Sequence, residues 1–300
     1  MMSRCFIVNP NAAGGNARQI FDKAISQLEI SEKDKIVVCK KWRSIRSEAR
    51  KALDDNFKRI VAVGGDGTVG QVASAFFHKG KNLFPNSSLA VLPAGTGSDF
   101  YRSLALARSH HNQSKQSLHE VVDIFFIRLD HEEIYGINTV SLGITAEIMQ
   151  RKESLPSYIP RPFQYILATL LTVSTWESQH ISIYLNEQLL AKPCLTLLLT
   201  KGRYGGGGMK LGEEGQLNSG NFATSFVPPV NFIQFLRYFF VLYRRGLRSV
   251  PLVETSFANK AEVFQSPFEH LEVDGEIYAF KTVSIKLLRA SLKIEDVCSE

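Results

Sequence analysis

The sequence predicts two domains of different architecture: an α/β nucleotide-binding domain with a parallel sheet and helices, followed by a mainly antiparallel β-sandwich domain. With 300 residues and 44% hydrophobic content, the chain can bury sizeable cores and is not expected to be disordered. Strand and helix patterns alternate up to about residue 127, which is typical of a parallel sheet covered by helices. Short alternating apolar runs dominate after that point. We therefore predict domains at 1–127 and 128–300.

Four apolar runs in the first domain predict strands, and four further stretches predict helices. The strands are expected at 5–8, 35–39, 60–63 and 89–92, and the helices at 17–28, 45–54, 69–77 and 99–106. Three unusual loops each follow one of these strands, at 9–15, 64–68 and 93–99. Ligands of parallel sheets bind beyond the carboxyl ends of the strands, so we expect these loops to line one crevice.

The second domain is expected to be β-rich with two helices. Its predicted strands are 124–129, 181–185, 195–200, 261–265, 271–274 and 283–287, and its helices lie near 161–177 and 230–245. The polar segment 107–119 is interpreted as a loop near the domain boundary. No carboxylate or cysteine completes a metal site there, so three histidines are interpreted as surface residues: His110, His111 and His119.

The most informative motif is Gly-Gly-Asp-Gly-Thr at 64–68, between a buried-strand run and a helix-like stretch. A glycine turn between a strand and a helix lets backbone N–H groups approach a phosphate, and the helix N-terminus adds a favourable dipole. Asp66 would repel a polyphosphate unless it holds a magnesium ion or the waters of that ion. The motif therefore predicts a nucleotide triphosphate site with a metal, and hence phosphoryl transfer.

Two other interpretations of this loop are weaker. Gly65, Gly67 and Gly70 also fit a dinucleotide-binding fingerprint, but that fingerprint needs an acidic residue about 20 positions further on. The residues there are Ser, Leu and Ala at 88–90. A turn without a ligand is the plain alternative, although an aspartate flanked by three glycines is costly in backbone entropy for a mere turn. The chain has no Gly-Lys-Ser/Thr, so this is not a P-loop.

Composition narrows the class of partner. The net charge of +6 favours anionic partners such as nucleotide phosphates or acidic lipid surfaces. Nucleic acid is not expected, because no such motif occurs and the basic residues are not gathered into one tract. Four widely spaced cysteines form neither a zinc pattern nor a disulfide frame: Cys5, Cys39, Cys194 and Cys298. The sequence shows no secretory segment and no apolar stretch long enough to span a bilayer. We therefore expect a cytoplasmic protein, at most peripheral to a membrane.

The stretch 230–248 carries four arginines, Arg237, Arg244, Arg245 and Arg248, among apolar residues that include Phe232, Phe235, Leu236, Phe239, Phe240, Leu242 and Tyr243. One interpretation is a core helix that covers the β domain, because buried apolar helices are common. The other is that part of this helix meets a lipid surface, with the aromatic residues inward and the arginines at anionic headgroups. The sequence leaves both interpretations open.

Six segments, in this order and spacing, resemble the diacylglycerol kinase catalytic-domain family. The segments are 8–15, 64–68, 92–100, 141–143, 204–211 and 273–276. Within that family the chain is most similar to the bacterial soluble lipid kinases, which are related to sphingosine kinases and more distantly to NAD kinases. The Pro-x-Gly-Thr-x-Ser-Asp segment at 93–99 separates it from NAD kinases, which lack that segment.

The resemblance implies an N-terminal nucleotide domain and a C-terminal β-sandwich, with ATP and magnesium in the cleft between them and a lipid hydroxyl as acceptor. It implies that Asp66 organises the magnesium, through water, that Asp99 lies near the metal waters or the acceptor, and that Glu276 is the general base. The residues implied to hold ATP are Asn9, Pro10, Asn11, Ala12, Ala13, Gly14, Cys39, Gly64, Gly65, Asp66, Gly67, Thr68, Val69, Gly70 and Thr96.

The chain departs from the family at three places. Gly70 and Gln71 stand where the family usually has Asn-Glu, and Cys39 stands where it often has threonine. Ser219 stands where the bacterial members have the aspartate of a structural magnesium site, and serine is a poorer magnesium ligand. Without their context, several of these motifs, such as Asp-Gly-Glu at 274–276, would be interpreted as ordinary turns.

Two functions of different class follow. The first is an ATP-dependent lipid kinase that phosphorylates a diacylglycerol-like or sphingoid-like hydroxyl to give a phospholipid and ADP. The second is a catalytically weak nucleotide- and lipid-binding regulatory relative, and an NAD kinase-like activity is a remote third. Retention of Asp66, Asp99 and Glu276 favours the first. The lipid and the oligomeric state stay open.

Overall fold

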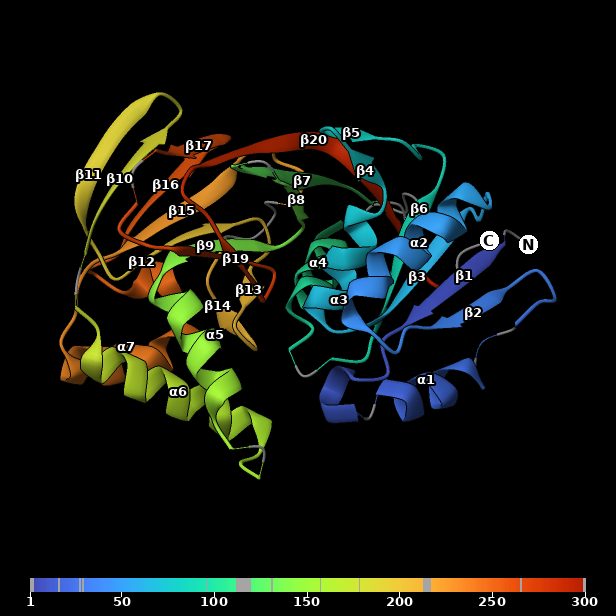
Figure 1. Ribbon diagram of the computed structural model, residues 1–300, viewed down its shortest axis with the longest axis horizontal. Coiled ribbons are helices and arrows are strands. Elements are labelled where there is room, and N and C mark those ends of the chain that lie inside the picture. The colour runs from blue at the N-terminus through green and yellow to red at the C-terminus, as the bar shows by residue number, and fades with distance from the viewer. Residues whose placement is uncertain are drawn as a thin grey trace.

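The computed structural model describes residues 3–15, 17–26, 28, 30–95, 97–111, 120–130, 132–156, 158–177, 179–212, 217–264 and 266–298. It confirms the predicted fold class. An α/β domain with a parallel sheet lies beside a domain built from antiparallel sheets (Figure 1).

The first domain places its parallel strands in the order β2-β1-β3-β6. Every residue of β1 and β3 is buried, because helices cover the sheet. Val8 pairs with both Val38 and Val63, so these strands end at one edge of the sheet. The elements are β1 (Arg4–Val8), α1 (Ala17–Ile25), β2 (Lys35–Val38), α2 (Ile45–Asp54), β3 (Arg59–Gly64), α3 (Asp66–Ser74), β4 (Phe77–His78), β5 (Lys81–Asn82), β6 (Ser88–Pro93) and α4 (Asp99–His111).

The second domain packs a six-stranded sheet, β16-β15-β12-β9-β18-β19, against the end of a longer sheet. Buried side chains from both sheets, such as Phe125, Leu197, Phe222 and Ile285, form the core between them. The elements are β7 (Glu120–Leu129), β8 (Glu132–Gly136), β9 (Thr139–Gly143), α5 (Ile144–Ser154), α6 (Arg161–Thr175), β10 (Gln179–Leu185), β11 (Gln188–Cys194), β12 (Thr196–Thr200), β13 (Tyr204–Gly205), β14 (Met209–Lys210), β15 (Phe222–Val227), α7 (Phe232–Arg244), β16 (Glu254–Ala258), β17 (Lys260–Val263), β18 (His270–Val273), β19 (Glu276–Ala279) and β20 (Val283–Glu295).

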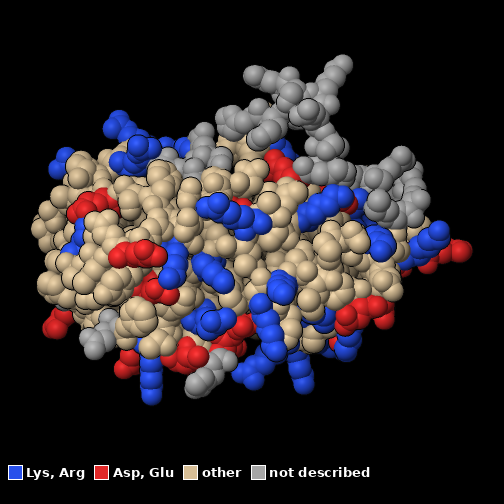
Figure 2. Space-filling view, turned by 90° about the horizontal axis from the view of Figure 1, so that it is seen from above, with Lys and Arg blue, Asp and Glu red and all other residues tan. Residues whose placement is uncertain are grey.

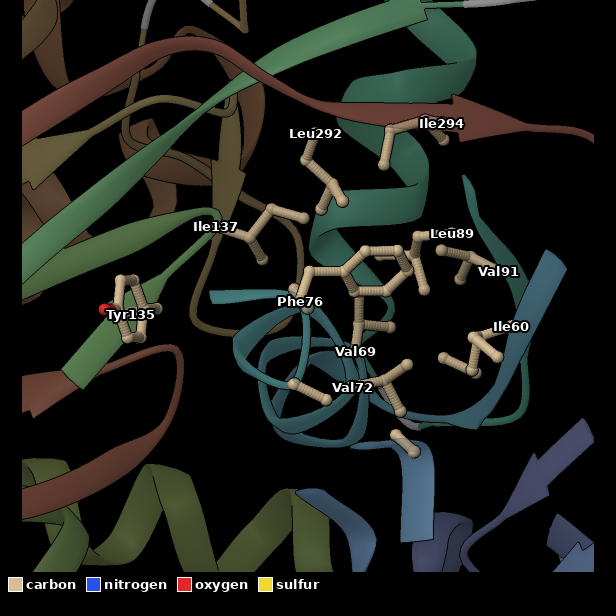
Figure 3. Close-up of a cluster of buried hydrophobic side chains, with 14 of the residues drawn as sticks. Ile60, Val69, Val72, Phe76, Leu89, Val91, Tyr135, Ile137, Leu292 and Ile294 are labelled. Carbon is tan, nitrogen blue, oxygen red and sulfur yellow. The ribbon is translucent and has the colours of Figure 1, made fainter. Parts of the chain in front are cut away.

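The last strand, β20, joins the two domains. It pairs antiparallel with β7 from Val283 to Ile294 and with β17 in its first part, and Ile294 and Glu295 at its end also pair parallel with β6. One sheet therefore runs through both domains. Figure 3 shows the resulting shared core, in which Phe76 points toward Leu89 of β6 and Leu292 and Ile294 of β20 lie close by. The division at 127/128 stays a prediction, and the end of the chain packs on the first domain.

The structure differs from the predicted elements in several strands of the second domain that were not predicted, β8, β9, β11, β15, β16 and β19, and in three helices. Helix α4 continues to His111, so residues 107–111 are helical, and the predicted loop there is wrong; residues 112–119, with His119, lie outside the described residues. Helix α3 begins at Asp66 instead of residue 69, because the glycine turn itself forms its first turn. Helix α5 was not predicted, since it follows β9 without a break.

A buried ion pair fastens the end of the chain to the first domain. Arg59 of β3 donates two hydrogen bonds to Glu295 Oε2, at 2.9 and 2.6 Å, and both side chains are almost fully buried. Burial alone would raise the pKa of Glu295, but hydrogen bonds from Lys293, Ser88 and Arg59 outweigh it and lower this pKa to about 2. The ionised pair is therefore part of what holds β20 against β3 and β6.

We expect Glu295→Gln to lower the free energy of unfolding by about 3–5 kcal/mol, because it leaves the Arg59 charge buried without its partner. The pKa of Glu295 is lower in the folded state than in the unfolded state. The stability that the parent gains from the ionised pair is therefore fully present above the unfolded pKa near 4.3 and is lost as the pH falls toward 2. Urea unfolding of both proteins between pH 7 and pH 3 measures this difference in the free energy of unfolding. As a control, Glu254→Gln breaks an exposed pair with Lys192 and should change stability by about 1 kcal/mol or less. Equal unfolding midpoints for Glu295→Gln and the parent would contradict this account.

Candidate active site

The glycine loops meet at the edge where the parallel strands end. Gly64 pairs with Pro93 as β3 and β6 finish, and the Ala94 N–H donates to the Gly64 carbonyl at 2.9 Å. A Cβ atom on Gly95 would lie 2.3 Å from the Gly65 Cα, so these positions have no room for a side chain. The loops predicted at 64–68 and 93–99 therefore form one continuous surface of closely packed backbone.

The first loop is tied to the same surface through Asn9. Its side-chain N–H donates to Thr68 Oγ1 at 3.0 Å, and its Oδ1 accepts the Asn11 N–H at 3.1 Å. Asn9 and Thr68 are both buried, so they brace the loop after β1 against the first turn of α3. The structure thus brings the first two predicted loops together, and direct contact of Asn9 with ATP stays a prediction.

The other residues implied in ATP binding lie around this surface. Cys39 follows β2, and its N–H donates to the Val8 carbonyl at 2.8 Å; burial raises the pKa of its thiol, which keeps it protonated. Val69 and Gly70 are buried in the first turns of α3. Pro10 and Asn11 lie in the loop after β1, Ala12, Ala13 and Gly14 lie in a 3-10 helix at Ala12–Gly15, and Thr96 lies outside the described residues.

Asp66 connects two helix N-termini. It is the first residue of α3, and its two carboxylate oxygens accept the N–H groups of Asp99 and Phe100 at 3.0 and 2.8 Å, at the start of α4. Helix N-termini stabilise negative charge, so this is a favourable position for a carboxylate. Asp66 and Asp99, predicted from separate motifs, are neighbours in the structure.

Asp99 is buried and only partly satisfied. Its Oδ2 accepts the Gly207 N–H at 2.7 Å from the turn between β13 and β14, whereas Oδ1 has no hydrogen-bond partner among the described residues and lies 3.8 Å from the Arg102 guanidinium. Burial, and then the charge of Asp66, raise the pKa of Asp99 to about 6. A cation placed here would relieve both effects.

These carboxylates fit a hydrated magnesium ion. A Cβ on Gly97 would lie 3.3 Å from Asp66 Oδ2 and 3.3 Å from Asp99 Oδ2, so the two groups flank one small space. Within the described part of the chain, no three His, Cys, Asp or Glu side chains gather as a metal cage. Magnesium in phosphoryl-transfer sites usually keeps several waters and takes only one or two carboxylates. Asp66 and Asp99 are the residues that would hold it.

The β18–β19 hairpin brings Glu276 against the glycine turn at the start of α3. Asp274 in its turn accepts three backbone N–H groups, from Ile137, Asn138 and Thr139, at 2.7, 2.9 and 2.9 Å. A Cβ on Gly70 would lie 3.1 Å from Asp274 Oδ2, so the turn packs directly on α3. Asp274 therefore fixes where the next residues of the hairpin point.

Glu276 faces the glycine loop in a partly buried position. Its Oε1 lies 3.3 Å from where a Cβ of Gly67 would be, and Trp42 packs against the same glycine. Burial, and then the charges of Glu153 and Asp274, raise the pKa of Glu276 to about 7. A carboxyl group with a pKa near neutrality suits proton transfer, because it can both take and release a proton.

Three residues of the crevice were not predicted. Asp274 was interpreted within a motif but not as the anchor of Glu276. Gly207 belongs to the four-glycine segment whose role the sequence left open, and its N–H, not a side chain, makes the contact with Asp99. Trp42 follows the Cys39 position within a basic run, and nothing in the sequence signalled its packing on Gly67.

Near Ser219 the protein supplies its own cation. The Lys201 ammonium is buried and donates to Asp123 Oδ2 at 2.7 Å and to the Asn221 carbonyl at 2.8 Å, while Ser219 Oγ donates to the same carbonyl at 3.0 Å. Burial, only partly offset by Asp123, lowers the pKa of Lys201. The carboxylate of Asp123 on β7 and the Asn221 carbonyl of this turn are therefore already bound by an ammonium group.

Comparison with known proteins agrees with this architecture. Residues 3–127 match the family model of the diacylglycerol kinase catalytic domain, and residues 138–295 match the YegS C-terminal NAD kinase beta sandwich-like domain. A diacylglycerol kinase of Staphylococcus saprophyticus is 26% identical over 235 residues, which is 77% of this chain and 74% of that protein. A protein of Alcanivorax borkumensis named "Probable lipid kinase YegS-like" is 26% identical over 251 residues, covering 82% and 81% of the two chains.

The fold has close counterparts among solved structures. A crystal structure of a diacylglycerol kinase from Bacillus anthracis superposes with a TM-score of 0.68 over 97% of this chain and 96% of that chain, at 18% identity. Together the two family models cover nearly the whole chain, at 3–127 and 138–295. The chain belongs to the diacylglycerol kinase catalytic-domain family, in the bacterial YegS-like branch of lipid kinases.

Proposed function

We propose that this protein is an ATP-dependent lipid kinase that transfers the γ-phosphoryl group of ATP to the hydroxyl of a diacylglycerol-like or sphingoid-like lipid, giving a phospholipid and ADP. The observation that carries the proposal is the pairing of two kinds of carboxyl group across one crevice. Asp66 and Asp99 form an anionic pair suited to a metal, and Glu276, with its raised pKa, faces the glycine loop from the other domain.

Each of these groups has a distinct task in the proposed reaction. Backbone N–H groups of the glycine loops bind the phosphates at the start of α3. Magnesium, held by Asp66 and Asp99 through water, supplies positive charge to the phosphates when bound. Glu276 takes the proton of the acceptor hydroxyl as the hydroxyl oxygen bonds to the γ-phosphorus. The bond between the γ-phosphorus and the β-phosphate oxygen breaks, and ADP leaves.

The regulatory alternative rests on Ser219 and on Gly70 and Gln71, which replace the usual Asn-Glu pair. The packing of this region gives Gly70 a structural reason: a Cβ there would lie 3.1 Å from Asp274 Oδ2, so a larger residue would push on the anchor of Glu276. In this chain a glycine at position 70 is therefore consistent with the close packing of the β18–β19 hairpin on α3. We accordingly retain the kinase as the proposed function.

The test is incubation of the protein with labelled ATP, magnesium and a panel of vesicles containing diacylglycerol, a sphingoid base, ceramide, monoacylglycerol or phosphatidylglycerol. We expect label in one lipid product, with one ADP released for each label transferred. Binding of ATP without transfer to any lipid would favour the regulatory alternative. Transfer to NAD in a parallel reaction, with no lipid product, would favour an NAD kinase-like activity.

A further inference from the structure

Two neighbouring helices of the second domain expose apolar side chains to solvent. Helices α6 and α7 pack on each other and lie beneath the β-sandwich at the lower left of Figure 1. None of the residues of α7 is buried, although it carries Phe, Ile, Leu, Val and Tyr side chains. Soluble proteins rarely leave a continuous apolar surface on two adjacent helices without a partner.

The exposed residues of α7 form a stripe along one side. Ile233, Leu236, Phe240 and Tyr243 recur at spacings of three and four residues, with exposed fractions of 78% for Ile233 and 69% for Phe240. Helical residues at this spacing share one face. The helix is well defined at its start, where Asn231 and Gln234 form a reciprocal capping box. A regular, capped helix therefore presents an apolar stripe to the surroundings.

Helix α6, which packs on α7, carries a second exposed apolar stripe. Phe163, Ile166, Leu167 and Leu171 share a face by the same spacing and are exposed, Phe163 by 64%. The other side of α6 is held in place: Ala168 and Val173 are buried in a cluster with residues of α5. We call the exposed residues of α6 and α7 together the apolar face. Because the inner sides of the helices are already packed, the apolar face has no partner within the described residues.

The segments that carry the apolar face contain basic residues but no acidic ones. No Asp or Glu occurs at 157–176 or at 227–253, whereas α7 carries Arg237 and Arg244. A cavity of about 170 Å³ lined by Lys210, Arg245 and Arg248, among others, lies where α7 ends. The face at the top of Figure 1 differs, because acidic and basic side chains are interspersed there (Figure 2). An apolar surface with only basic groups suits an anionic lipid surface.

We propose that the apolar face is the surface by which this protein docks on anionic membranes, with Phe240 and Ile233 entering the interface and Arg237 and Arg244 at the headgroups. This inference rests on the proposed function in one respect: an acceptor lipid that resides in a bilayer gives the protein a reason to bind there. A second copy of the chain is a poorer occupant, because an acid-free, arginine-bearing face repels itself. Docking would hold the second domain on the surface of the bilayer. Among the described residues, no helix is long and apolar enough to span a membrane.

The test is vesicle sedimentation without ATP, comparing phosphatidylcholine vesicles with vesicles that also contain phosphatidylglycerol. We expect the parent to sediment with the anionic vesicles and less so with rising salt, since salt screens surface charge. The double variant Ile233→Asp/Phe240→Asp should lose at least about tenfold in partition, because two apolar contacts become charged. The variant Arg237→Gln/Arg244→Gln should lose about fivefold for each arginine removed.

The control replaces exposed apolar residues on another surface, Leu189 of β11 and Phe264 after β17, which are 52% and 60% exposed. Leu189→Asp/Phe264→Asp should sediment like the parent. Equal sedimentation of the α7 double variant and the parent, or no binding of the parent to anionic vesicles, would overturn the proposal. So would a lipid-free dimer by ultracentrifugation that Ile233→Asp/Phe240→Asp dissociates, because the face would then bind a second copy.

A second measurement separates this inference from the proposed kinase. Activity is assayed on a short-chain lipid acceptor dissolved without a bilayer, where docking is not needed. The α7 double variant should keep the parental turnover there and lose it on vesicles. If no acceptor is phosphorylated in any form while vesicle binding follows the pattern above, the kinase proposal fails and the docking surface stands.

Discussion

Asp66→Asn should lower kcat by about 10²- to 10³-fold or more, as expected when a charge that organises the transferring phosphates is removed. The carboxylate and amide have nearly the same shape, so the fold should survive. The amide side chain would keep one oxygen for the N–H groups at the start of α4, where Asp66 now accepts two, at 3.0 and 2.8 Å. We expect that loss to cost about 0.5–2 kcal/mol of stability.

Ligand binding gives Asp66→Asn a second readout. Affinity for ATP with magnesium should fall, whereas affinity for ATP alone should stay or rise, because the carboxylate repels the polyphosphate. Titration calorimetry with and without magnesium measures both. Asp130→Asn is the matched control: Asp130 also accepts two backbone N–H groups, from Lys281 and Thr282 at 3.1 and 3.0 Å, but on the surface of the second domain. A folded Asp66→Asn protein with the turnover and magnesium dependence of Asp130→Asn would rule out the metal role.

Glu276→Gln should lower kcat by about 10²- to 10⁴-fold and leave ATP affinity nearly unchanged, because a general base acts on the acceptor hydroxyl. Glutamine keeps the shape of the side chain beside Gly67 and Trp42 but cannot take a proton. Turnover at saturating ATP and direct ATP binding separate these effects. Collapse of ATP affinity with intact turnover would instead place Glu276 in nucleotide binding.

The pH dependence supplies an independent check on Glu276. Burial first, and then the charges of Glu153 and Asp274, raise its pKa to about 7, and the base must be ionised to act. We therefore expect kcat/KM of the parent to rise about tenfold per pH unit below 7 and to level off above it. Glu153→Gln removes one of the charges that raise this pKa, so its profile should shift toward lower pH. A profile that is flat from pH 5.5 to 8, or unmoved by Glu153→Gln, would show that Glu276 does not govern the rate.

Much of the candidate site was predictable because its residues lie in short contiguous motifs. The glycine turn at 64–68 and the segment at 93–99 need particular residue types in an unbroken order, so their place between strand and helix could be predicted. Parallel strands that end together then imply that their loops meet, and the contact of Gly65 with Gly95 agrees with this. Asp66 was named as a candidate site residue from its motif, and Asp99 and Glu276 from the family resemblance; their roles stay predictions.

The sequence by itself thus determined the two kinds of domain, the loops at the strand ends and the residue types of the site, because these depend on local order and on short periodic patterns. Tertiary structure alone decided the rest, since it depends on residues far apart in the chain. The pKa of Glu276 follows from burial and from the charges of Glu153 and Asp274, and β20 returns to β6 so that Glu295 meets Arg59 across 236 positions. The sequence likewise left open whether α7 is a core or a surface helix, and the structure shows an exposed apolar stripe on it. Periodicity shows that a helix has an apolar side, but only the neighbouring elements determine whether that side is covered.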